Sequence, residues 1–208
     1  PQGAVEGHDN SVNCAIFAPD GSSLITGSTD KTIRVWELPY GALVRELTGH
    51  IRAVVTLALS PDASILASGS YDANAKLWEL ATGEEIATLK GHKKQVGSVV
   101  FAPDGKSVLG GGFGSEILRW SVPDGELLGP IETDAVAVGS LRFTLDGKHL
   151  LGALRGEGKL AFWNAETWAV EREIALAGPG VHPVALSPDG ATIAVGSDRT
   201  ITWYDLQR

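Results

Sequence analysis

Three polar residues between positions 50 and 72 have the chemistry of a hydrolase triad. Ser68 offers a hydroxyl nucleophile, His50 a base and Asp72 a carboxylate to orient that base. The same residue types recur 42 residues earlier, in His8, Thr26 and Asp30. A triad needs one exposed nucleophile beside an oxyanion hole, so a set that recurs with Thr in place of Ser favours a structural role. We therefore expect that the protein is not an enzyme.

Other motifs that could hold a cofactor or a metal are incomplete. Gly105-Lys106-Ser107 has the residue order of the end of a phosphate-binding loop, but Val100 stands where that loop requires a glycine. The five histidines have no metal-ligand spacing, and the single cysteine, Cys14, excludes a thiolate zinc cluster and an internal disulfide. We expect no cofactor and no metal. The cysteine usage fits a reducing compartment, so we expect a cytoplasmic protein.

The charge and hydropathy of the chain limit its partners. Its 208 residues include 17 Lys and Arg against 25 Asp and Glu, a formal net charge of −8. Proteins that bind nucleic acid or anionic membranes concentrate Lys and Arg, so we expect neither partner. No apolar run reaches the ~18 residues that suggest a membrane helix.

The elements that position these polar residues follow a repeat along the chain. Five tryptophans are spaced by 42, 42, 43 and 40 residues: Trp36, Trp78, Trp120, Trp163 and Trp203. A turn motif recurs nearly in phase with them, as in Pro19-Asp20-Gly21 and Pro103-Asp104-Gly105. Two markers in phase predict five repeats in one domain over residues 1–208, with each tryptophan in the same structural place.

Each repeat has the pattern of short β-strands. Apolar runs such as Val12–Phe17 precede the turn, in which Pro presets φ and Gly takes a positive φ. Segments such as Thr32–Trp36 then alternate apolar and polar residues with a period of two. Four strands of about 5–6 residues, with their turns, fill one repeat. The sequence therefore predicts an all-β fold.

A Gly-His pair lies 28 residues before each of the first three tryptophans, at Gly7-His8, Gly49-His50 and Gly91-His92. The strands that carry Trp36 and Trp78 end in Trp-Glu. In these features the chain resembles the WD-repeat family of β-propellers over essentially its whole length. The resemblance implies a β-propeller of five blades, each a four-stranded antiparallel sheet. It says little about function, because one fold hosts many functions.

The resemblance also implies a buried hydrogen-bond chain that braces each blade. It is expected to run from Trp to Ser or Thr, then to the Asp of the tight turn and to His. In blade 1 the chain would use Trp36, Thr26, Asp30 and His8, and in blade 2 it would use Trp78, Ser68, Asp72 and His50. A buried indole N–H and an imidazole need partners, and a turn Asp can accept from both.

The later repeats depart from this pattern. Blade 3 keeps His92 and Trp120 but has Gly110 and Gly114 in place of the hydroxyl and the carboxylate. Blade 4 has Asp134, Ala153 and Glu157 at the three positions, and blade 5 has Ala177 in place of His. If the hydrogen-bond chain stabilises a blade, blades 3 to 5 should open more readily than blades 1 and 2.

Closure of the ring determines the expected oligomeric state. We expect Pro1–Glu6 to pair beside the strand Thr200–Tyr204, so that the N-terminal strand closes a monomeric five-bladed ring. One alternative is a fragment of a larger propeller or multidomain protein that completes itself as a homo-oligomer. Another is an engineered propeller whose main property is self-assembly.

Proteins that resemble this chain bind partners on the face formed by the Gly-His loops and the tight turns. The candidate residues on that face are Asn10, Thr29, Arg52, Tyr71, Lys93, Lys94 and Phe113. They favour a non-catalytic scaffold that binds a protein or an acidic peptide, with Arg as donor and the rings as anchors. Ordinary exposed loop residues are the alternative interpretation. A lectin-like propeller with one small-ligand pocket per blade is a third hypothesis, disfavoured because Thr29, Tyr71 and Phe113 differ at equivalent positions.

Overall fold

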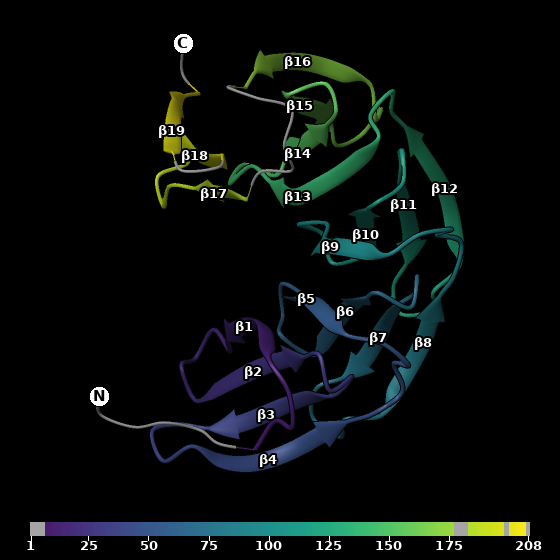
Figure 1. The fold of residues 1–208 in the computed structure, drawn as a ribbon, viewed down its shortest axis with the longest axis vertical. Helices are drawn as coiled ribbons and strands as arrows, with labels where there is room; N and C mark the ends of the chain where they lie inside the picture. The colour runs from purple at the N-terminus through teal and green to yellow at the C-terminus, as the bar shows by residue number, and fades with distance from the viewer. Residues whose placement is uncertain (1–6, 177–182, 198–199, 207–208) are drawn as a thin grey trace.

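The protein is a five-bladed, all-β propeller. Its structure, a computed structural model, describes residues 7–176, 183–197 and 200–206. Figure 1 shows five antiparallel sheets arranged as blades around a common axis. The predicted fold class is confirmed. Among these described residues, no helix is long and apolar enough to cross a membrane.

Each blade is a sheet in which consecutive strands pair. Blade 1 contains β1 (Val12–Phe17), β2 (Ser23–Ser28), β3 (Ile33–Glu37) and β4 (Ala42–Leu47). Blade 2 contains β5 (Val54–Leu59), β6 (Ile65–Ser70), β7 (Ala75–Glu79) and β8 (Glu85–Leu89). Blade 3 contains β9 (Val96–Phe101), β10 (Ser107–Gly112), β11 (Glu116–Ser121) and β12 (Leu127–Glu132). Blade 4 contains β13 (Ala137–Phe143), β14 (His149–Arg155), β15 (Lys159–Asn164) and β16 (Val170–Ala175). Blade 5 contains β17 (Val184–Leu186), β18 (Thr192–Ser197) and β19 (Thr200–Asp205) among the described residues.

The first strand of each blade lies nearest the axis (Figure 1). It is joined to the second strand by the Pro-Asp-Gly type of turn, in which Gly21 has a φ of 71°. The Asp20 carboxylate accepts a hydrogen bond of 2.9 Å from the backbone N–H of Ser22. These turns lie at one end of the strands, and the turns between second and third strands lie at the other end.

Apolar clusters join each blade to the next. Between blades 1 and 2, Ile25 and Val35 of blade 1 pack with Leu57 and Trp78 of blade 2. Similar clusters join blades 2 and 3, 3 and 4, and 4 and 5. Because strand side chains alternate between faces, each of blades 2 to 4 has one face toward the preceding blade and one toward the following blade.

Blade 5 departs from the predicted equivalence of the five tryptophans. In blade 1, Leu24 pairs with Trp36, whereas the corresponding residue of blade 5, Ile193, pairs with Tyr204. Tyr204 therefore takes the place of the tryptophan, and Trp203 points to the opposite face. Trp36, Trp78, Trp120 and Trp163 are at most 2% exposed, but Trp203 is 73% exposed.

A shorter hairpin explains this difference. Ser197 pairs with Thr200, so two residues join β18 and β19. A shift of one residue in the pairing register moves every side chain of the strand to the other face. The equivalence predicted for Trp203 is therefore wrong. The predicted strand Pro1–Glu6 beside Thr200–Tyr204 lies outside the described residues.

Candidate functional site

The polar set of blade 1 forms one continuous chain of hydrogen bonds. Trp36 Nε1 donates to Thr26 Oγ1 at 2.8 Å, and Thr26 Oγ1 lies 2.7 Å from His8 Nε2. His8 Nδ1 lies 2.8 Å from Asp30 Oδ2. The histidine therefore stands between the hydroxyl and the carboxylate. The predicted order, with Asp next to the hydroxyl, is wrong.

The polar set of blade 2 repeats this geometry. Trp78 Nε1 donates to Ser68 Oγ at 2.8 Å, Ser68 Oγ lies 2.8 Å from His50 Nε2, and His50 Nδ1 lies 2.8 Å from Asp72 Oδ2. The backbone N–H of Ile51 also donates to Asp72 Oδ2 at 3.0 Å. The Gly-His loop is thus tied to the turn between β6 and β7.

Burial and hydrogen bonding shift the pKa values of His50 and Asp72 in blade 2. Burial lowers the pKa of His50, and the hydrogen bond to Asp72 opposes the shift without cancelling it. Burial acts to raise the pKa of Asp72, but hydrogen bonds from His50 and from the Ile51 backbone outweigh it, so the pKa lies below its ordinary value. A neutral imidazole can then donate from Nδ1 to the Asp72 carboxylate and accept at Nε2 from the Ser68 hydroxyl.

The hydrogen bonds of this set connect the same groups as those of a hydrolase triad, but a substrate cannot reach the Ser68 hydroxyl. Ser68 is 0% exposed, and its oxygen already accepts the indole N–H of Trp78. A nucleophile must reach a substrate carbonyl beside oxyanion donors, so a buried oxygen in this position cannot act as one.

Blades 3 and 4 lack the hydroxyl, and their polar groups are arranged differently. Trp120 Nε1 donates to the backbone oxygen of Lys90 at 2.9 Å. His92 Nε2 and Trp163 Nε1 are buried and have no hydrogen-bond partner in the described part of the chain. Burial lowers the pKa of His92 to about 4. Ala177, the blade 5 equivalent of the histidine, lies outside the described residues.

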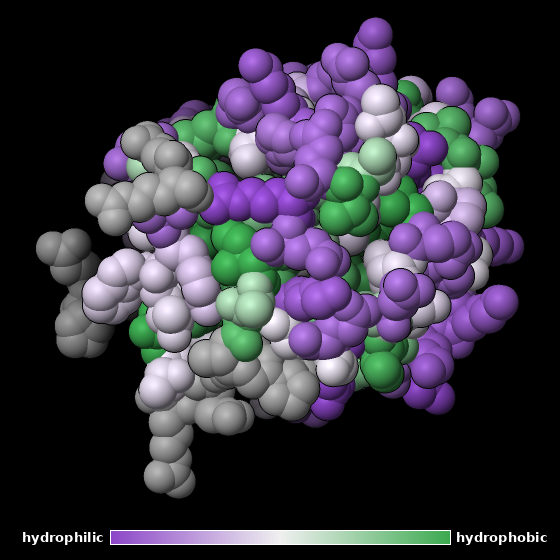
Figure 2. Space-filling view, turned by 90° about the horizontal axis from the view of Figure 1, so that it is seen from above, coloured by the Kyte–Doolittle hydropathy of each residue, from purple (hydrophilic) through white to green (hydrophobic). Residues whose placement is uncertain are grey.

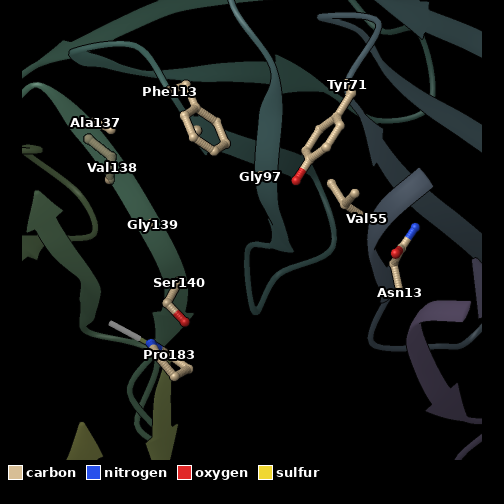
Figure 3. A pocket seen from close by; sticks show the side chains of 11 residues that line it. Asn13, Val55, Tyr71, Gly97, Phe113, Ala137, Val138, Gly139, Ser140 and Pro183 are labelled. Carbon is tan, nitrogen blue, oxygen red and sulfur yellow. The ribbon is translucent and has the colours of Figure 1, made fainter. Parts of the chain in front are cut away.

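A pocket of about 450 Å³ lies at the axis, where residues of all five blades meet. Asn13, Val55, Gly97 and Gly139 line it from the first strands of blades 1 to 4, and Pro183 precedes β17. Figure 3 shows Tyr71 and Phe113 at the same pocket, on either side of Gly97. We refer to this space as the axial pocket.

β-Bulges direct the inner residues toward the axis. Val12 pairs with Ser28 and Cys14 with Gly27, which leaves Asn13 as the extra residue of the strand. Equivalent shifts in β5 and β9 leave out Val55 and Gly97. A bulge bends the strand and re-aims the side chain of the extra residue, so these residues belong to the pocket rather than to a blade face.

The tight turns supply an aromatic wall. The rings of Tyr71 and Phe113 meet edge to face at a centroid distance of 6.3 Å and an interplanar angle of 88°. They are 42% and 38% exposed. None of the described residues that line the pocket carries a charged side chain. The axial pocket therefore suits an apolar or neutral group more than a charged one.

The structure brings part of the candidate binding set to this pocket. Tyr71 and Phe113 line it, and Thr29 is hydrogen-bonded to the lining residue Asn13 at 3.0 Å. The remaining candidates, which are exposed but do not line the pocket, are Asn10, Arg52, Lys93 and Lys94.

Backbone hydrogen bonds place the basic loops beside the aromatic turns. The N–H of Tyr71 donates to the Ala53 oxygen at 3.0 Å, next to Arg52 in the chain. The N–H of Phe113 donates to the Gln95 oxygen at 3.1 Å, next to Lys94. The loops that carry these cations therefore lie beside the turns that carry both rings.

Sequence reasoning missed the inner lining residues, although a signal for them existed. Asn13, Val55, Gly97 and Gly139 are each 42 residues apart, in phase with the other markers. Two of them are glycines and the other two are Asn13 and Val55, so a search for a recurring polar or aromatic side chain could not select them.

Comparison with known protein families identifies repeats along most of the chain. The family model described as "WD domain, G-beta repeat" matches residues 1–37, 41–79, 83–121 and 180–205, which is more than half of the chain. The unmatched interval contains blade 4, in which Asp134, Ala153 and Glu157 replace the polar set.

Curated relatives match over single short stretches. Nuclear distribution protein nudF of Aspergillus flavus is 44% identical over 46 residues, 22% of this chain and 10% of that protein. Nuclear distribution protein PAC1 of Ajellomyces capsulatus is 41% identical over 49 residues, 24% of this chain and 11% of that protein. A serine-threonine kinase receptor-associated protein of Dictyostelium discoideum is 53% identical over 32 residues, 15% of this chain and 11% of that protein. The chain spans about a tenth of the length of these relatives.

Proposed function

This chain belongs to the WD domain, G-beta repeat family, and on that premise we propose that it is a non-catalytic scaffold that binds a protein or peptide segment at the axial pocket. The observation that carries the proposal is the pocket itself, a neutral cavity of about 450 Å³ with two exposed rings on one wall. One of the matched relatives is named as a receptor-associated protein, which agrees with a binding role.

The pocket fits the anchor of a peptide rather than the peptide as a whole. Tyr71 and Phe113 offer large, rigid apolar surface, the kind of surface that dominates binding energy at protein interfaces. A large apolar side chain of the partner would enter between these rings and the bulge residues of the inner strands. Backbone groups beside the anchor would remain near solvent at the rim.

The flanking cations favour acidic residues beside that anchor. Arg52, Lys93 and Lys94 are exposed on the loops that are hydrogen-bonded to the aromatic turns. The chain as a whole has a net charge of −8, so a local group of cations is a distinguishing feature of this face. Opposite charge at the rim steers association and adds specificity more than affinity.

A lectin-like function receives less support from the same residues. One pocket per blade requires the same lining in each blade, but Asn13 and Val55 differ in size and polarity from each other and from Gly97 and Gly139. A non-catalytic role agrees with the burial of the Ser68 and Thr26 hydroxyls.

Selection from a phage-displayed library of random peptides, panned on the full chain, tests the proposal. We expect enriched peptides to share a large apolar residue next to acidic residues. Measured by fluorescence anisotropy, Tyr71→Ala combined with Phe113→Ala should weaken binding by about 10- to 100-fold. Arg52→Glu combined with Lys94→Glu should weaken it about 10-fold and reduce its salt dependence.

A charge reversal at the other end of the strands is the matched control. Lys106 lies in the turn between β9 and β10 and is exposed. Lys106→Glu should leave peptide affinity unchanged. Enrichment no greater than on an empty support, or equal binding by the double alanine variant, would contradict the proposal.

A further inference from the structure

The outward sides of the first and last blades carry large exposed apolar residues. On blade 1, Val12 and Phe17 are 53% and 67% exposed. On blade 5, Ile201 and Trp203 are 70% and 73% exposed. We refer to these two pairs as the blade 1 end face and the blade 5 end face.

Residues equivalent to the blade 1 end face are buried or half-buried in the inner blades. Val12 corresponds to Val54 and Val96, which are both 0% exposed and pack toward the preceding blade. Phe17 corresponds to Phe101, which is 6% exposed in the cluster that joins blades 2 and 3, and to Leu59 and Phe143, which are half-buried against the clusters of their own interfaces. The blade 1 end face is therefore one half of an inter-blade interface.

The blade 5 end face is the other half of such an interface. Ile201 pairs with Gly196 as Ile33 pairs with Gly27, and Ile33 is 0% exposed. Trp203 pairs with Ala194, and this position is filled in blades 1, 2 and 4 by residues that are 0–5% exposed: Val35, Leu77 and Phe162. Each of these residues packs against the following blade. The register shift thus places an indole where the other blades bury an apolar side chain in the next interface.

Among the described residues, the two halves do not meet within one copy of the chain. Apolar clusters of the described residues join blades 1 and 2, 2 and 3, 3 and 4, and 4 and 5, and none joins blade 5 to blade 1. Viewed from above, hydrophilic residues cover much of the molecule, whereas the side formed by blade 5, at the left of Figure 2, is paler. Exposed groups of large apolar residues of this kind mark interaction surfaces.

We propose that the blade 5 end face of one copy packs against the blade 1 end face of a second copy. A second copy is the fitting partner because this chain itself carries both halves of the interface that recurs four times within it. The contact is head to tail, since different surfaces of the two copies meet. Val12 and Phe17 of one copy then receive Ile201 and Trp203 of the other.

The molar mass of the full chain, measured by multi-angle light scattering over a wide range of concentration, tests the proposal. We expect a mass above the 21.8 kDa of one chain that falls on dilution. Phe17→Glu and Trp203→Glu should each raise the dissociation constant roughly 30-fold or more and return the mass to one chain. Tyr40, 86% exposed in the turn between β3 and β4, gives the control, because Tyr40→Glu should keep the wild-type mass.

Mixing the two variants distinguishes a head-to-tail contact from other self-association. The Phe17→Glu chain keeps its blade 5 end face, and the Trp203→Glu chain keeps its blade 1 end face, so the mixture should form two-chain particles and nothing larger. Circular dichroism of each variant verifies that the β-fold is kept. A wild-type mass of one chain at every concentration would overturn the proposal. So would oligomers that survive both substitutions, or a mixture that stays monomeric.

Discussion

Removal of the Thr26 hydroxyl is the sharpest test of the hydrogen-bond chain in blade 1. Thr26 Oγ1 accepts from Trp36 Nε1 at 2.8 Å and lies 2.7 Å from His8 Nε2. Thr26 and Trp36 are 4% and 2% exposed. Thr26→Val keeps the shape of the side chain and leaves both ring nitrogens without their partner, in a place that water does not reach.

The expected loss follows from the number of stranded groups. A buried polar group that loses its partner costs about 1–3 kcal/mol, so two such groups should lower the free energy of unfolding by about 2–6 kcal/mol. This is a large fraction of the ~5–15 kcal/mol that stabilises a typical domain. Thr26→Ser keeps the hydroxyl and removes one methyl group, which should cost only about 1 kcal/mol.

Urea unfolding followed by circular dichroism and by tryptophan fluorescence measures the difference. The midpoint should fall much further for Thr26→Val than for Thr26→Ser, with similar slopes, because the surface exposed on unfolding is nearly the same. Equal midpoints for the two variants would refute the reasoning. They would mean that the shape of residue 26, and not its hydrogen bonds, determines its contribution.

Four further predictions follow from the same geometry. Because burial lowers the pKa of His92 to about 4, against about 6.5 in an unfolded chain, the unfolded state binds more protons below pH 6.5. The free energy of unfolding should therefore fall by about 2–3 kcal/mol between pH 6.5 and pH 4, and His92→Leu should remove this component from the pH profile. A Cβ added at Gly112 would clash with the backbone oxygen of Gln95, whereas one added at Gly114 meets nothing within 4 Å. Gly112→Ala should thus destabilise the fold by about 1–3 kcal/mol or more and Gly114→Ala should be nearly neutral, as measured by urea unfolding. Since burial raises the pKa of Cys14 to about 12, a thiol-specific dye at pH 8 should label the denatured chain far faster than the folded one. Amide hydrogen exchange should be faster in blades 3 and 4 than in blades 1 and 2, and equal protection in all four would contradict a stabilising role for the hydrogen-bond chain.

The period of the repeat accounts for what could be predicted of the fold. Turn chemistry at Asp20 and Gly21 and the alternation from Thr32 to Trp36 are local features, so strand positions could be read without knowledge of tertiary contacts. The resemblance to WD repeats implied that His50, Ser68 and Asp72 form one hydrogen-bonded group, and the 42-residue spacing showed that His8, Thr26 and Asp30 are their equivalents in blade 1.

Sequence spacing alone could not predict which of Ser68, His50 and Asp72 are hydrogen-bonded to each other. An Asp in a tight turn is close to both the loop and the strand, so residue types alone allow it to contact the hydroxyl. The structure has His50 between Ser68 and Asp72, because the two ring nitrogens bridge groups on either side. The inner pocket was also missed, since a bulge at Asn13 or Val55 leaves no mark in the hydrophobic pattern.

In blade 5, the shorter hairpin between β18 and β19 determines which side chains of β19 are buried and which are exposed. The shorter hairpin after Ser197 moves Tyr204 into the interface with blade 4, where it packs against the cluster of Leu151 and Phe162, and turns Trp203 to the outside. Burial of an indole side chain such as that of Trp203 is strongly favourable, so the stability of the propeller depends on what covers the blade 5 end face. If a second copy covers it, the unfolding midpoint of the wild-type chain must rise with protein concentration, and that of Trp203→Glu must not. The register of one hairpin is thus coupled to the assembly of the whole chain.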